Sequence, residues 1–234
     1  LGSGMSHYLE HMLFKGTSTR SAPEITAQVQ AIGGDINAYS TYDRTVYHIS
    51  CPSEGAGKAV EILHDMLFRS RLDDEELQRE RDVILREIAM NMDDPDRRIA
   101  RRVFETAFHD HPYRLPVIGH AELFSQIEAD TLREYYRSRY TTHNMVLVVA
   151  GDLPREELEA MLQRTFAAER VRQTSTPFTP AEPDQLARRT SRMQDKVSVC
   201  RGSVASRVPG LSHEDSPALD MLASILGGNE SSIL

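Results

Sequence analysis

Apolar residues recur every three or four positions along most of the chain, which is the period of an amphipathic α-helix. Ser21 precedes one such stretch as a cap, and Gly33-Gly34 ends it. Val46, Tyr47 and Ile49 instead favour an extended backbone. The pattern predicts strands at 35–41 and 44–51, and helices at 3–16, 22–32, 54–69, 73–95, 96–109, 130–140 and 154–168.

The second half of the chain changes character twice. Met145–Ala150 is almost entirely apolar, which predicts a central strand buried on both faces. Residues 172–193, rich in Thr, Pro, Gln and Arg, have no periodicity and are expected to be a linker. A strand at 197–206 and a helix at 216–226 would open a new unit. We therefore expect an α+β fold, with a first domain at 1–171 and a second beginning at 194–234.

Charge and composition exclude several classes of protein. The formal net charge of −8 gives no basic surface, so nucleic acid is not an expected partner. No apolar run is long enough to span a membrane. Cys51 and Cys200 do not form a C-x-x-C pattern, which argues against a cysteine zinc site.

The segment from His7 to His11 carries the most specific chemistry in the sequence. Its order is H-x-x-E-H, with Glu10 as the acid. On a helix, residues four apart share a face, so both imidazoles project to one side. Two such nitrogen donors suit one tetrahedral zinc, and an adjacent carboxylate suits metal-assisted hydrolysis. The alternative is an amphipathic helix with two surface histidines.

Glu80, Glu87 and Asn91 fall on one stripe of the helix predicted at 73–95, because they are seven and four residues apart. Acids on a helix are most often just a solvated face. Glu87 lies 76 positions after His11. This spacing indicates a role for Glu87 only through the family resemblance described next.

The run from Gly4 to Thr17 closely resembles the pitrilysin/insulinase family of zinc peptidases, M16, also called inverzincins. Further segments resemble family motifs in the same order along the chain. These are Gly33–Ser40 (G-G-x-x-N-A-x-[ST]), His111–Gly119 (H-P-Y-x-x-P-[IV]-[IL]-G), Asn144–Asp152 and Gly227–Ser232.

This resemblance implies a mainly antiparallel sheet flanked by helices, in a repeated two-domain architecture. It implies one zinc ion held by His7, His11 and Glu87, with Glu10 as general base and Glu80 as a supporting acid. Asn37 and Ala38 would lie on an edge strand that binds the backbone of a peptide substrate; for Asn37 an ordinary strand-edge role is the alternative.

The same resemblance implies a second homologous half or subunit that closes a chamber and supplies an arginine and a tyrosine to the substrate. The function it implies is that of a zinc metalloendopeptidase. A non-catalytic core or partner subunit of the same fold is the competing hypothesis, and an unrelated metal-binding module is a third. The chain starts one turn before the zinc motif, so we expect a piece of a longer protein.

Overall fold

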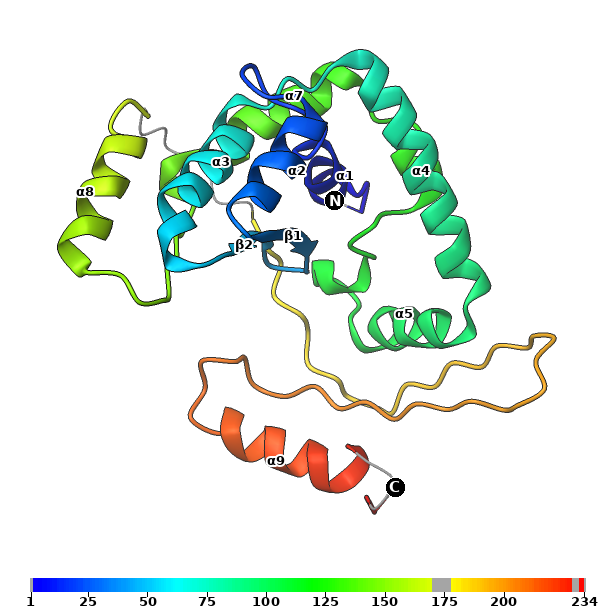
Figure 1. Ribbon diagram of the computed structural model, residues 1–234. Coiled ribbons are helices and arrows are strands. Elements are labelled where there is room, and N and C mark those ends of the chain that lie inside the picture. Colours follow the sequence, from blue (N-terminus) through cyan, green and yellow to red (C-terminus); the bar gives the residue numbers. More distant parts are fainter. Residues whose placement is uncertain (1, 170–177, 229–231, 234) are drawn as a thin grey trace.

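A computed structural model describes residues 2–169, 178–228 and 232–233 (Figure 1). Residues 172–177 of the expected linker and 229–231 of the last family motif lie outside them. The helices near the start and in the middle of the chain are α1 (Met5–Met12), α2 (Ala22–Ala31), α3 (Ala56–Arg69), α4 (Asp74–Asp93), α5 (Pro95–Ala107), α6 (Ala121–Phe124), α7 (Ala129–Arg139) and α8 (Arg155–Phe166). Single 3₁₀ turns lie at Ser53–Gly55, Pro112–Arg114 and Thr142–Asn144.

Every predicted helix is present, the short helix α6 was not predicted, and the helix ends follow local chemistry. The backbone N–H of Ser21 donates to the carboxylate of Glu24 at the start of α2. Asp94 ends α4 and caps α5, because its side chain accepts from the N–H groups of Asp96 and Arg97. Helix α1 is shorter at both ends than the predicted 3–16.

The core forms around α1. Its apolar face, Tyr8, Leu9 and Met12, is almost fully buried against α4, α6 and α7. A smaller cluster lies between α2 and α3, around Ile25 and Ile62. This packing fixes the position of α1, and with it the opposite face of the helix, which carries the H-x-x-E-H residues.

The sheet is a two-stranded antiparallel hairpin of β1 (Asp35–Ser40) and β2 (Thr45–Ser50). It lies beside α1, α2 and α3 (Figure 1). The α+β fold with an antiparallel sheet is confirmed, although helices dominate the described residues.

Two predicted strands are wrong. Residues 145–150 are not a buried strand, since Val146 is 90% and Val148 79% exposed. Residues 197–206 likewise form no strand, and Val204 is exposed. A strand is stable only when a neighbour satisfies its backbone groups, and in the described part of the chain neither segment has such a neighbour.

The predicted helix near the C-terminal end is α9 (Ser216–Gly227), which follows an extended segment that passes below α5 (Figure 1). Residues 178–193, the described part of the expected linker, contain neither helix nor strand. Within the described residues, no helix is long and apolar enough to cross a membrane.

Candidate metal centre and peptide edge

Helix α1 presents His7, Glu10 and His11 on the side away from its buried apolar face. Its start is fixed by a close backbone contact: a Cβ on Gly4 would lie 2.2 Å from the carbonyl oxygen of Ile118, and Gly4 has φ 82°. Only glycine fits there. The contact ties α1 to Gly119, the last residue of the His111–Gly119 loop.

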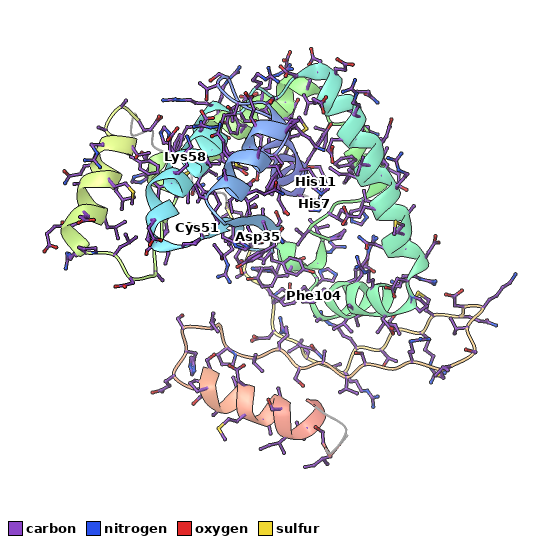
Figure 2. The ribbon with its side chains drawn as sticks, viewed as in Figure 1. His7, His11, Asp35, Cys51, Lys58 and Phe104 are labelled. Carbon is purple, nitrogen blue, oxygen red and sulfur yellow. The ribbon has the colours of Figure 1, made fainter. Side chains whose placement is uncertain are left out.

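His7, His11 and Glu87 come together between α1 and α4. Figure 2 labels the two histidines, which lie side by side on α1. The Nε2 atoms of both histidines lie 3.7 Å from Oε2 of Glu87, and one ligand atom from each residue lies within 4.8 Å of the others. Ligand atoms on one tetrahedral zinc, each about 2.0–2.2 Å from the metal, are about 3.3 Å apart. The three side chains therefore fit zinc if their ligand atoms move slightly closer together.

Glu80 bonds to the ring nitrogen of His11 that points away from Glu87. Its Oε1 lies 3.0 Å from Nδ1 of His11, and its Oε2 lies 2.5 Å from Nζ of Lys15. Burial raises the pKa of Glu80, but the hydrogen bonds from His11 and Lys15 outweigh it and leave the pKa below its usual value. The carboxylate is thus kept charged and orients the imidazole so that Nε2 faces Glu87.

His7 is kept neutral. Burial, and secondarily the nearby imidazole of His11, lower the pKa of His7 to about 4. A metal needs an unprotonated ring nitrogen. The Nδ1 atom of His7 is buried and has no hydrogen-bond partner among the described residues.

Glu10 has a free carboxylate oxygen at the same site. Its Oε2 is buried and accepts no hydrogen bond from any group in the described parts of the chain. Tyr47 and Tyr140 lie near it, joined by a hydroxyl–hydroxyl hydrogen bond of 2.7 Å. Burial raises the pKa of Tyr47 well above its usual value, the Tyr140 partner adds to this, and the charge of Glu10 contributes. Glu10 therefore faces protein rather than open water on one side.

Strand β1 is paired with β2 on one edge, and no described strand pairs with its other edge. The N–H of Thr41 donates to the carbonyl of Arg44. This bond shows which residues of β1 bond to β2, because every second residue of an antiparallel strand does so. Counting back by twos, Tyr39 and Asn37 bond to β2, whereas the backbone groups of Ala38 point to the free edge. The N–H of Ala38 donates instead to Oδ1 of its neighbour Asn37, at 2.8 Å.

Two contacts of the site could not be predicted from the sequence. Lys15, which pairs with Glu80, follows the motif by four residues but has no periodic relation to Glu80. Tyr140, the residue that follows α7, bonds to Tyr47 over a separation of 93 residues. A cross-strand or interhelical contact of this kind exists only once the tertiary packing is formed.

An H-x-x-E-H helix packed against a second helix with a facing carboxylate is typical of zinc peptidases. The sequence pattern described as Insulinase (Peptidase family M16) matches residues 2–121, and that described as Peptidase M16 inactive domain matches residues 126–234. The chain belongs to peptidase family M16.

Individual relatives agree. A protein of Mycobacterium leprae named as an uncharacterised zinc protease is 33% identical over 243 residues, covering 99% of this chain and 53% of that relative. A protease from Helicobacter pylori has a solved structure with a TM-score of 0.90 at 26% identity, covering 99% of this chain and 56% of that one. Pitrilysin is similar with a TM-score of 0.66 and 25% identity over 76% of this chain and 20% of pitrilysin. The chain thus spans about half the length of the curated relatives it matches.

Proposed function

We propose that this chain forms the catalytic half of a zinc-dependent metalloendopeptidase. The observation that carries the proposal is the cluster of His7, His11 and Glu87 with Glu10 beside it, its carboxylate oxygen unpartnered among the described residues. Membership of a peptidase family and relatives named as zinc proteases support it.

In this proposal one zinc ion is held by His7, His11 and Glu87. Bound there, zinc supplies Lewis acidity, which lowers the pKa of water and polarises the scissile carbonyl. Glu10 accepts the proton of the attacking water and passes it to the leaving amine, so the base becomes the acid. Glu80 keeps the ring of His11 in the required orientation and raises its basicity.

The substrate in this proposal is an extended peptide or an unfolded protein segment. It pairs with the free edge of β1, where the backbone groups of Ala38 point outward. Asn37, which covers the N–H of Ala38, turns aside and bonds to the substrate backbone. Backbone pairing does not read side chains, so selectivity should be broad.

The proposal includes a second homologous half or subunit. This chain spans about half of its relatives, and Glu87 has a side chain that is 37% exposed. An opposing half would exclude water from this surface and supply groups that stabilise the oxyanion.

The test separates metal binding from catalysis in the intact protein. Glu10→Gln should abolish hydrolysis of a quenched peptide while zinc content and fold are retained, because an amide cannot take a proton from water. His7→Ala, His11→Ala and Glu87→Ala should lower zinc occupancy as well as activity. Metal analysis beside the peptide assay reads out both.

Two results would contradict parts of the proposal. Unchanged zinc stoichiometry and affinity in Glu87→Ala would exclude Glu87 as a ligand. An intact, zinc-loaded wild-type protein without zinc-dependent turnover would instead favour a non-catalytic partner subunit of the same fold.

A further inference from the structure

The loop from His111 to Gly119 contacts two parts of the site. At one end Gly119 packs against the start of α1, where a Cβ would lie 2.6 Å from the carbonyl carbon of Ser3. Near the other end, the hydroxyl of Tyr113 donates to the carboxylate of Asp43, 2.7 and 2.8 Å from its two oxygens. Asp43 lies in the turn between β1 and β2. The loop therefore connects α1, which carries His7 and His11, with the hairpin whose strand β1 has the free edge.

Aromatic packing adds to that connection. Tyr42, the neighbouring turn residue, stacks on Phe104 of α5 with ring centroids 4.9 Å apart, and its ring lies 5.0 Å from that of Tyr113. Phe108 and His111 surround Tyr113 further, at 5.5 and 4.3 Å. These contacts hold the turn against α5 with apolar area as well as with a hydrogen bond.

The loop itself is held by a carboxylate from the extended segment that follows residue 178. The carboxylate of Glu182 accepts hydrogen bonds from the backbone N–H groups of His109, Asp110 and His111, at 2.7, 2.9 and 2.9 Å. Its side chain is only 8% exposed. Such a concave row of N–H groups is a favourable site for an anion, and here a side chain of the same chain occupies it.

Charges around Glu182 strengthen the attachment. Burial raises the pKa of Glu182, but the N–H donors outweigh it and hold the pKa at about 2. Arg189 and Arg207 each lie 3.6 Å from its Oε1. Arg189 also donates to the carbonyls of Thr106 and Ala107 at the end of α5. The extended segment is therefore fixed to α5 and to the loop at the same place.

We propose that Tyr113 and Glu182 are positioning residues for the peptide-binding edge of β1. Glu182 fixes the His109–His111 backbone, Tyr113 fixes the hairpin turn through Asp43, and the free edge at Ala38 is thereby held at one place relative to α1. This inference rests on the proposed peptidase function for the role of that edge. A two-stranded hairpin is marginally stable by itself, so its turn needs an outside attachment.

The test uses the intact, zinc-loaded protein with Glu10→Gln as background, so that the Kd of an extended peptide can be measured without turnover. Tyr113→Phe removes the hydroxyl and keeps the ring, and Glu182→Gln removes the charge and keeps the shape. Each should raise the Kd about five-fold, the effect of one partly exposed hydrogen bond to a charged group. Each should also speed amide hydrogen exchange in residues 35–45.

Matched variants control for general loss of stability. Tyr136→Phe removes a hydroxyl that donates to the carbonyl of Leu67, and Glu61→Gln removes the charge of an acid that pairs with Lys58 and Arg20. Both should leave the Kd and the exchange of residues 35–45 unchanged. Asp43→Asn should retain most of the affinity, because its amide oxygen still accepts from Tyr113.

The outcomes are distinct. An unchanged Kd, an unchanged exchange rate in residues 35–45, or equal effects in the control variants would each overturn the positioning role. If the wild-type protein shows no zinc-dependent hydrolysis while Tyr113→Phe still weakens peptide binding and speeds exchange, the proposed catalysis fails and the positioning role stands.

Discussion

Glu80 shows how a single buried acid can orient a neighbouring histidine, here the proposed metal ligand His11. It lies on α4 with 4% exposure, and its two oxygens go to different partners, Nδ1 of His11 and Nζ of Lys15. Lys15 balances the charge that burial would otherwise penalise, and Nε2 of His11 is left to face Glu87. The acid is therefore suited to orienting a metal ligand rather than to binding the metal itself.

At this scale we expect Glu80→Gln to lower the affinity for zinc about ten-fold, the usual effect of losing an outer carboxylate partner of a ligand histidine. Competition with a chelator measures it. Glu76→Gln, on the same helix and paired with Arg79, is the matched control and should have no effect. Equal zinc affinity in wild type and Glu80→Gln would refute the role.

Asp65 is a second buried acid, and it concerns stability alone. Burial raises its pKa, but hydrogen bonds from Thr17, Arg20 and Thr19 outweigh this and lower it. The donors lie at 2.6, 2.7 and 2.8 Å from Oδ2, and Asp65 is 1% exposed. A carboxylate with a depressed pKa stabilises the folded state above its unfolded pKa of about 3.9 and loses that contribution as the pH falls through the folded value.

Asp65→Asn should lower the free energy of unfolding at pH 7 by about 2 kcal/mol. The wild-type advantage over this variant should shrink as the pH falls below about 4. Denaturant unfolding of the intact protein at pH 7 and at lower pH measures both. Asp130→Asn, which removes a 94% exposed partner of Arg133, should cost less than about 1 kcal/mol. A wild-type advantage that does not depend on pH would contradict the assignment.

At the scale of elements, the two edges of β1 make different demands on its residues. The N–H of Ala38 points to the free edge, whereas that of Tyr39 points into the β1–β2 ladder. Proline removes a donor in either place, but only at Ala38 is the donor available to a substrate.

We therefore expect Ala38→Pro to raise KM severalfold with little change in zinc content. Ala38→Gly, which keeps the N–H, is the control and should remain near wild type. Tyr39→Pro should instead destabilise the hairpin by breaking a ladder bond. Steady-state kinetics and hydrogen exchange distinguish the two, and an unchanged KM in Ala38→Pro would exclude peptide pairing at this edge.

Local periodicity predicted the helices because their hydrogen bonds are internal and their apolar faces repeat within a few residues. It failed for 145–150 and 197–206, because an apolar run cannot indicate which strand, if any, will pair with it. His7 and His11 could be predicted to share a face, since one helix carries both. Glu87 came from a family resemblance, and the structure places it beside them. Lys15 and Tyr113 lie in segments that resemble family motifs, and Glu182 does not. The partners of all three are distant in the sequence, so local periodicity could not predict these contacts.

At the scale of the whole molecule, several apolar side chains of the described residues are exposed to solvent. Val146 and Val148 are largely exposed, and so is Val204. Glu87 has one side toward solvent. Exposed apolar area favours association with further protein, and aggregation when it is left bare.

The last prediction concerns residues 1–234 as an isolated chain. The proposed ligands and base are all present, so a folded form should bind zinc. In the proposed two-half enzyme, however, an opposing half would supply an arginine and a tyrosine that hold the substrate and its oxyanion. Losing one such donor costs about 100- to 1000-fold in kcat. We therefore expect turnover of a quenched peptide at least about 100-fold below that of the intact protein, with equal zinc content verified by metal analysis. Adding the proposed second half or partner subunit should restore activity, whereas turnover of the isolated chain near that of the intact protein would refute the need for a second half.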